Sequence, residues 1–201
     1  GPADLPADLI AGAKVVQASG ISQAISASAA DAVFEAFALA RSKGVLTAYD
    51  TNLRLKLWPL TRARAIVHAA CEMADIVLPG DGDAKLLTGL EQPDAIVDFY
   101  LKLGAKVVAL TLGHEGSLVA TPDQRQRFVP IKVEAIDATG AGDCYDGAFL
   151  AEYIRTGDAF AAGAYANVAA ALSTQGYGAV APLPRRAEVE ARITQEAAGR
   201  A

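Results

Sequence analysis

The sequence predicts one α/β domain, residues 1–201, in which a mainly parallel sheet lies between two layers of helices. Segments with strand character alternate with segments of helical periodicity, an order typical of parallel sheets. The strand segments are continuous apolar runs, as expected for strands buried on both faces. A chain of 201 residues with 52% hydrophobic residues is long enough for one substantial core.

Short apolar runs, several of them closed by Gly or Pro, predict the strands. The expected strands are residues 14–19, 45–49, 75–78, 106–111, 117–120 and 127–131. The last two are expected to be partly exposed around the turn Thr121-Pro122-Asp123. Ligands of parallel sheets sit at the carboxyl ends of the strands. The loops after Ser19, Tyr49, Leu78 and Thr111 are therefore the first places to look for a site.

Helical periodicity and end signals predict the helices. The expected helices are residues 28–43, 61–74, 81–87, 94–103, 143–155, 158–173 and 185–195. Ser28 and Asp31 have capping-box spacing at the first of these, and Gly44 is a suitable stop after it. Arg185 and Arg186 are interpreted as a solvated helix start.

Charge and cysteine usage exclude several classes of protein. Lys and Arg total 18 against 23 Asp and Glu, a net charge of −5, which disfavours a dedicated nucleic-acid binder. The most apolar stretch, residues 159–172, is too short and too interrupted to cross a membrane. Cys71 and Cys144 form no disulfide framework and have no metal-ligand spacing, which favours a reducing, cytoplasmic setting.

The strongest local signal is the sequence DATGAGD, Asp137 to Asp143, which opens a predicted helix. Its glycines allow the backbone to approach a ligand closely, and the helix start offers unpaired N–H groups to a phosphate. Asp143 in the first turn either favours the helix dipole or acts as a general base. The segment is neither a Walker A loop nor a dinucleotide-binding GxGxxG turn after a strand.

Residues 137–150, DATGAGDCYDGAFL, resemble the C-terminal signature of the ribokinase-like, or PfkB, sugar kinases. Further segments resemble the family in the same order along the chain. They are residues 75–89, 108–119, 166–172 and 182–184. Residues 50–54, DTNLR, with Leu57-Trp58, resemble the acceptor-side segment of 2-keto-3-deoxygluconate kinases. The resemblance implies a three-layer α/β/α sandwich that lacks the family's N-terminal strands and sugar-covering lid.

The resemblance also implies roles for individual residues. Asp143 matches the base that takes the proton from the sugar hydroxyl. Gly140, Ala141 and Gly142, with the Asp143 amide, match the anion hole for the transferred phosphoryl group. Such a pairing suits phosphoryl transfer, which depends mainly on alignment and charge stabilisation. The residues that match the surroundings of ATP are Thr111, Gly113, Gly116 and Asn167.

The remaining roles concern metals and the acceptor. Asp83 matches an acidic residue that reaches Mg²⁺ through water, and Asp137 and Thr139 match a monovalent cation (K⁺) site. Asn52 is placed to bind a hydroxyl, and the planar fork of Arg54 suits a carboxylate. The alternative role of Asn52 is that of a turn cap, and the alternative role of Arg54 is that of a surface charge.

Several positions depart from the family pattern. Ala138 replaces a hydroxyl residue, and Gly80-Asp81-Gly82-Asp83 replaces Asn-x-x-Glu, so that Asp83 is one methylene shorter than the usual acid. A further N-terminal region of the family, with a Gly-Gly motif, has no counterpart in these 201 residues. The chain is therefore expected to be the nucleotide-binding C-terminal portion of such a kinase.

Two function classes remain open. The first is an ATP-dependent sugar-acid kinase, with a ribokinase- or fructokinase-type neutral sugar kinase as the alternative. The second is a nucleotide-binding fragment without activity of its own, and a dinucleotide-dependent oxidoreductase is a distant third. The expected partners are ATP and a small sugar or sugar acid, without nucleic acid or membrane, and a homo-oligomer stays open. His68, His114, Cys144 and Trp58 are interpreted as packing or surface residues.

Overall fold

The computed structural model describes residues 1–198 and divides the chain into two compact units. Unit 1 comprises Gly1–Thr111 and Ala120–Arg125, and unit 2 comprises Leu112–Val119 and Gln126–Ala201. Six strands follow the order β1-β2-β3-β4-β5-β6 in the sheet, which is also their order in the chain. The α/β class and the mainly parallel sheet expected from the sequence are confirmed.

Unit 1 contains the four parallel strands. They are β1 (Val15–Ser19), β2 (Leu46–Asp50), β3 (Ile76–Leu78) and β4 (Val107–Thr111). Val16 lies opposite Thr47, Ala48 opposite Ile76, and Val77 opposite Val108. The central strands β2 to β4 are almost wholly buried, which explains why their sequences are continuous apolar runs.

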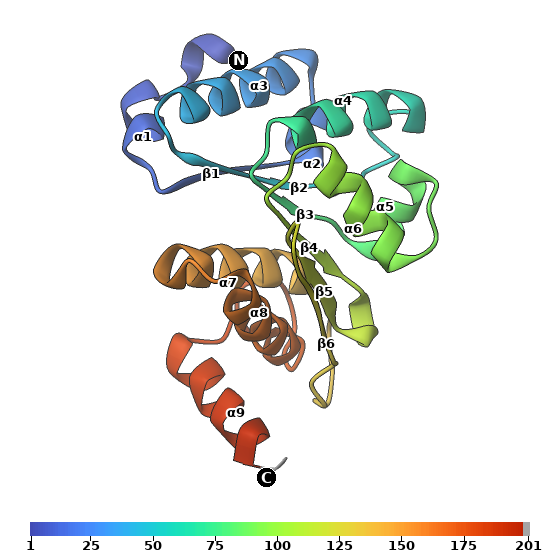
Figure 1. Cartoon of the computed structure of the whole chain (residues 1–201), viewed down its shortest axis with the longest axis vertical. Coiled ribbons are helices and arrows are strands. Elements are labelled where there is room, and N and C mark those ends of the chain that lie inside the picture. Colours follow the sequence, from blue (N-terminus) through green and yellow to red (C-terminus); the bar gives the residue numbers. More distant parts are fainter. Residues whose placement is uncertain (199–201) are drawn as a thin grey trace. The chain divides into compact units, whose positions relative to one another are not determined.

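The helices of unit 1 connect these strands. They are α1 (Ala7–Gly12), α2 (Gly20–Ala24), α3 (Ala27–Ser42), α4 (Leu60–Glu72), α5 (Asp81–Thr88) and α6 (Pro93–Lys102). Each parallel crossover moves to the next strand in the same direction, and right-handed crossovers of this kind place their helices on one face. Figure 1 shows α3 and α4 on the same side of β1 and β2. The aromatic rings of Phe37 on α3 and Tyr49 on β2 pack edge to face there, 6.2 Å apart.

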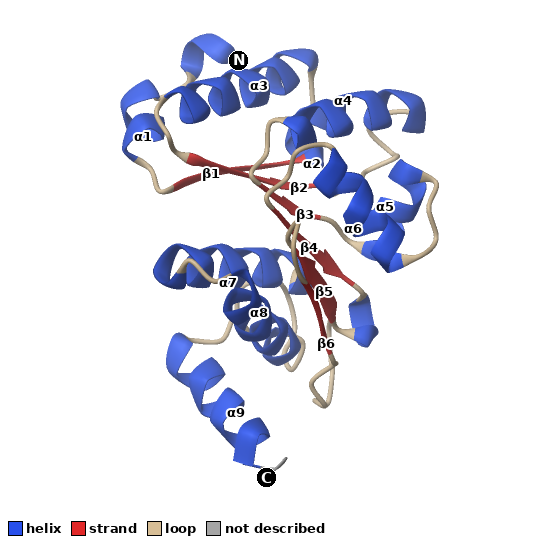
Figure 2. Cartoon of the chain, in the orientation of Figure 1, coloured by secondary structure: helices blue, strands red, loops and turns tan. Residues whose placement is uncertain are grey.

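Unit 2 is built mainly from helices, which follow a short hairpin whose turn, within Ala120–Arg125, belongs to unit 1. The strands β5 (Ser117–Ala120) and β6 (Arg125–Phe128) are joined by a turn in which Thr121 N–H donates to Gln124 O. So short a connection can only join antiparallel strands. The helices are α7 (Ala141–Thr156), α8 (Ala159–Ser173) and α9 (Arg186–Ala198), and α8 packs against both of the others. Figure 2 shows α7 and α8 as successive helices joined by a short loop.

Most predicted elements are confirmed within one or two residues, with four corrections. The cap of α3 is Ser26, not Ser28, and its hydroxyl accepts from Ala29 N–H at 3.0 Å. Strand β6 begins two residues before the predicted start at residue 127 and ends at Phe128, three residues before the predicted end. Strand β5 was expected to be partly exposed, but all four of its residues are buried. The short helices α1 and α2 were not predicted, because five or six residues are too few to show a periodicity. Within residues 1–198, no helix combines the length and the apolar character that a membrane crossing requires.

Candidate active site

The N-terminus of α7 presents unpaired backbone donors. Gly140 is the N-cap, and Cys144 N–H already closes the first helical turn on Gly140 O at 2.8 Å. Ala141 N–H donates to Ala138 O, whereas no described backbone or side-chain group caps the N–H groups of Gly142 and Asp143. Gly142 and Asp143 are exposed, and a Cβ added to Gly142 would meet nothing within 4 Å. Two uncapped donors and a carboxylate therefore share one open helix start, an arrangement suited to an anion.

The Asp137 carboxylate shapes the loop that leads into α7. Its Oδ1 accepts from Thr139 N–H at 2.9 Å, and its Oδ2 accepts from Gly178 N–H at 2.8 Å. Hydrogen bonds from Thr139 and from the Gly178 backbone lower the pKa of the Asp137 carboxyl. The loop before α7 is thus fastened to the loop after α8, and Gly178 is a participant that no local signal in the sequence identifies.

Gly140 is required by both its conformation and its surroundings. Its φ of 77° lies in the left-handed region that glycine adopts without steric cost. A Cβ at this position would lie 2.6 Å from the Cβ of Ala179, which follows Gly178. The close approach of the two loops therefore depends on the absence of a side chain at residue 140.

The segment predicted to lie over the nucleotide is held by its own backbone. Thr111 ends β4 in unit 1, where its N–H donates to Pro79 O at 2.9 Å. In unit 2, Gly113 is exposed, and Leu112 N–H closes the turn on Gly116 O at 2.8 Å. Gly116 has a φ of 92°, and a Cβ there would collide with the carbonyl oxygen of Phe128. Close packing against Phe128 therefore explains why residue 116 is a glycine, and the sequence alone could not show this contact.

Asn167 has a structural partner in unit 2. It lies on α8, only 9% exposed, and its Nδ2 donates to Val129 O at 2.8 Å. One turn earlier on the same helix, Gly163 faces Val119 and Phe128 so closely that a side chain would not fit. Asn167 and Gly163 therefore seat α8 against the hairpin and its exit.

The acceptor-side segment of unit 1 is tightly bound. Asp50 accepts two hydrogen bonds from Asn52: one from its N–H at 3.0 Å and one from its Nδ2 at 2.9 Å. Asn52 has a φ of 24°, the one positive value outside glycine among the described residues. Leu53 N–H donates to Asp83 Oδ2 at 2.8 Å, and Arg54 donates from Nη1 to Leu53 O at 2.9 Å. Asp50, two residues before Asn52, has the spacing of an Asx turn and was detectable on that ground.

Three buried polar atoms in this segment have no partner among the described residues. They are Thr51 Oγ1, Asn52 Oδ1 and Trp58 Nε1. Buried polar groups are normally satisfied, so unpaired atoms concentrated in one segment point to a bound group or to ordered water. Trp58 is 4% exposed, which confirms its interpretation as a packing residue.

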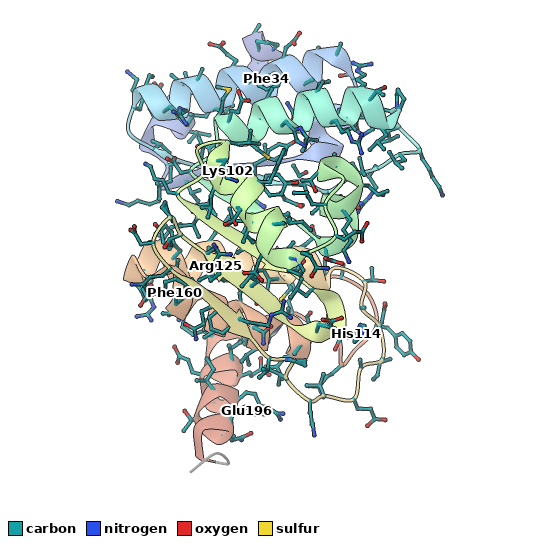
Figure 3. All side chains as sticks on the ribbon, turned by 45° about the vertical axis from the view of Figure 1, so that its right-hand side comes forward. Phe34, Lys102, His114, Arg125, Phe160 and Glu196 are labelled. Atoms are coloured by element: carbon teal, nitrogen blue, oxygen red, sulfur yellow. The ribbon has the colours of Figure 1, made fainter. Side chains whose placement is uncertain are left out.

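The other residues interpreted as structural behave as expected. Burial raises the pKa of the Cys144 thiol, and burial together with Arg64 lowers the pKa of His68, which packs on Phe99. Figure 3 labels His114 in the turn after β4, where its side chain is exposed. The interpretation of Arg185 and Arg186 as a solvated helix start is confirmed, because both are exposed and α9 begins at Arg186, but Arg186 also makes specific contacts. Its guanidinium pairs with Glu152 at 2.9 Å and lies 4.8 Å from the centroid of the Tyr165 ring.

The structure therefore assembles two groups of predicted site residues, one in each unit. Unit 1 brings together Asn52, Arg54 and Asp83 around Leu53. Unit 2 brings together Asp137, Thr139 and the start of α7.

Residues 2–186 match the model of the pfkB family of carbohydrate kinases. The chain belongs to this family. Ribokinase of Staphylococcus aureus (strain COL) is 32% identical over 164 residues, which cover 79% of this chain and 51% of the relative. The 2-dehydro-3-deoxygluconokinase of Thermoproteus tenax is 34% identical over 192 residues, 94% of this chain and 58% of the relative.

Solved structures agree with the PfkB assignment. A PfkB protein from Polaromonas sp. JS666 has a TM-score of 0.84 at 30% identity, over 95% of this chain and 61% of that one. Fructokinase of Vibrio cholerae O395, solved with fructose, ADP and calcium, has a TM-score of 0.82 at 29% identity, over 88% of this chain and 59% of that one. The chain thus spans between about half and three fifths of the length of these relatives.

Proposed function

We propose that this chain is the nucleotide-binding C-terminal portion of an ATP-dependent carbohydrate kinase that phosphorylates a sugar acid, with 2-keto-3-deoxygluconate as the favoured acceptor. The observation that carries the proposal is the start of α7. There Asp143 shares an open, uncapped helix N-terminus with the free amide of Gly142. A general base and an anion site must lie together for phosphoryl transfer, and this helix start supplies both.

The residues of the α7 start would divide the chemistry between them. The Asp143 carboxylate would accept the proton of the acceptor hydroxyl as the hydroxyl oxygen attacks the γ-phosphorus of ATP. The bond between the γ-phosphorus and the β,γ-bridging oxygen breaks at the same time, and ADP leaves. The N–H groups of Gly142 and Asp143, with Gly140 and Ala141 setting the turn, stabilise the negative charge on the transferred group. Positioning of the nucleotide falls to Thr111, Gly113, Gly116 and Asn167.

The metal sites are compatible with the donors present. Within residues 1–198, no group of three or more His, Cys, Asp or Glu side chains is placed to hold a metal ion. Mg²⁺ in kinases is held by one or two carboxylates and the substrate phosphates, so Asp83 reaching it through water fits such a site. Bound Mg²⁺ would neutralise phosphate charge. A monovalent cation such as K⁺ would be held beside Asp137 and Thr139; the Vibrio cholerae fructokinase double mutant was solved with potassium.

The acceptor assignment depends on Arg54. A sugar acid carries a carboxylate that a guanidinium recognises, and the 2-dehydro-3-deoxygluconokinase of Thermoproteus tenax is one of the chain's relatives. Two observations favour alternatives. Arg54 already donates to Leu53 O, so its guanidinium is partly occupied, which suits a kinase whose acceptor is a neutral sugar. The similarity to a ribokinase and a fructokinase favours the same alternative. The chain also spans only part of its relatives, which suits a nucleotide-binding fragment without activity of its own.

A substrate panel tests the proposal. 2-Keto-3-deoxygluconate, ribose and fructose are offered with ATP and Mg²⁺ to the wild type and to Arg54→Met, using the full-length protein. Loss of Arg54 is expected to cost the acid substrate about 2–4 kcal/mol in kcat/KM and a neutral sugar much less. Arg62→Met is the matched control, because Arg62 is also an exposed arginine but lies outside the acceptor segment, on α4. Wild-type preference for a neutral sugar would overturn the acid assignment, and equal losses would move Arg54 to the phosphates.

A further inference from the structure

Asp83 lies in the first turn of α5, where it contacts the backbone of the acceptor segment. Its Oδ2 accepts the N–H of Leu53, 30 residues earlier in the chain, at 2.8 Å. Leu53 is 5% exposed, and Asp83 is partly buried. A charged acceptor in a partly buried place makes a hydrogen bond stronger than a neutral pair.

Both backbone groups of Leu53 are engaged. Its N–H is taken by Asp83, and its carbonyl accepts Arg54 Nη1 at 2.9 Å. The two peptide groups that flank Leu53, which lies between the predicted acceptor ligands Asn52 and Arg54, are therefore both hydrogen-bonded.

The preceding residue, Asn52, is also held by hydrogen bonds. Asn52 has a φ of 24°, a left-handed backbone conformation that strains a residue with a side chain and persists only where its surroundings compensate for the strain. Asp50 maintains it by accepting both the N–H and the Nδ2 of Asn52. Two carboxylates, Asp50 and Asp83, thus bracket residues 52–54.

We infer that Asp83 is a positioning residue for the acceptor: its Oδ2 fixes Leu53 and thereby orients Asn52 and Arg54, while Oδ1 is left for a metal-bound water. This inference rests on the proposed kinase function. It assigns to one carboxylate a connection between the metal and the acceptor segment.

Two substitutions separate the hydrogen bond from the charge. Asp83→Asn keeps an oxygen that can accept the Leu53 N–H but removes the negative charge. Asp83→Ala removes both. Asp81→Ala is the matched control, because Asp81 occupies the same helical turn but pairs with Lys85 at 2.7 Å.

Hydrogen exchange of the Leu53 amide, measured by NMR on the unliganded chain, gives the first readout. Asp83→Ala is expected to speed this exchange by about tenfold or more, the effect of losing one charge-assisted hydrogen bond. Asp81→Ala is expected to stay close to the wild type, and Asp83→Asn, which keeps a neutral acceptor oxygen, is expected to lie between the wild type and Asp83→Ala. An Asp83→Ala chain with unchanged Leu53 protection would overturn the inference.

Steady-state kinetics of the full-length protein give the second readout. Asp83→Ala should raise KM for the acceptor more than KM for ATP, and Asp83→Asn should restore the acceptor KM while requiring more Mg²⁺ for half-maximal rate. If Asp83→Ala and Asp83→Asn raised KM for the acceptor equally, only the charge of Asp83 would matter. That result would also overturn the inference. A wild type that phosphorylates none of the sugars would defeat the kinase proposal instead, and Leu53 exchange would still report the contact.

Discussion

Asp137 Oδ2 and the backbone N–H of Gly178 are joined by a 2.8 Å hydrogen bond across 41 residues of sequence. The bond links the loop that opens α7 to the loop that follows α8. The other carboxylate oxygen of Asp137, Oδ1, accepts the N–H of Thr139 within the loop that opens α7. The open helix start at Gly142 and Asp143 therefore depends on a carboxylate that we do not expect to react.

Asp137→Ala is expected to lower turnover by roughly 10- to 100-fold, because small displacements of a positioned group have effects of this size. The substitution frees both the Thr139 and the Gly178 amides. Isothermal titration should also show weaker ATP binding. Asp123→Ala, at the exposed β5–β6 turn, is the control. Wild-type turnover in Asp137→Ala would contradict the prediction.

The Asp137 contact should depend on pH in a defined direction. Its native pKa is lowered by hydrogen bonds from Thr139 and Gly178, so its stabilising effect is present above the unfolded pKa of about 3.9 and is lost as pH falls through the native pKa. Gly178 amide protection, followed by NMR exchange, should therefore decline in acid below about pH 4. Asp137→Asn should remove this dependence.

Gly140 and Gly142 should respond in opposite ways to alanine. Gly140→Ala faces a left-handed φ of 77° and a contact with Ala179, so it should lose roughly 1–2 kcal/mol or more of unfolding free energy. Gly142→Ala has open space in a helix and should gain about 0.5–1 kcal/mol. Urea unfolding measures both changes. A bulky residue at 142 should keep the fold and block phosphate binding, and unchanged ATP affinity there would count against the anion site.

Asp143→Asn should keep the fold and ATP binding but lose about 10²-fold or more in turnover, the scale for loss of a general base. The carboxylate is exposed, so its replacement leaves the packing intact. Calorimetry with ATP checks that binding is retained. Near-normal turnover in this variant would exclude Asp143 as the base.

Glu152 should contribute to stability through α9. Its side chain is 6% exposed, and it accepts from Arg155 and Arg186. Glu152→Ala should cost about 1.5–3 kcal/mol, because the carboxylate's charged hydrogen bonds are lost. The matched control is Arg125→Ala, the residue labelled in Figure 3, whose partners Asp94 and Asp98 are exposed and whose loss should cost below about 1 kcal/mol. Similar losses in the two variants would contradict the prediction.

The fold was accessible from the sequence because its signals are local. Apolar runs marked β2 to β4, and glycine or aspartate marked the ends of α3 and α8. The chemistry of residues 137–143 was also readable, because backbone donors at a helix start and an acid in its first turn lie close together in sequence. Propensity and periodicity therefore identified the elements and the candidate reactive group.

The tertiary structure alone decided which distant residues share an environment. No local pattern joins Asp137 to Gly178 or Leu53 to Asp83, and no local pattern shows that Arg186 lies on Tyr165. These contacts arise because packing brings segments 21 to 41 residues apart within hydrogen-bonding or stacking distance, where burial determines which polar groups must be paired. The sequence determined the elements and their reactive side chains, and the packing of those elements determined how the side chains are held.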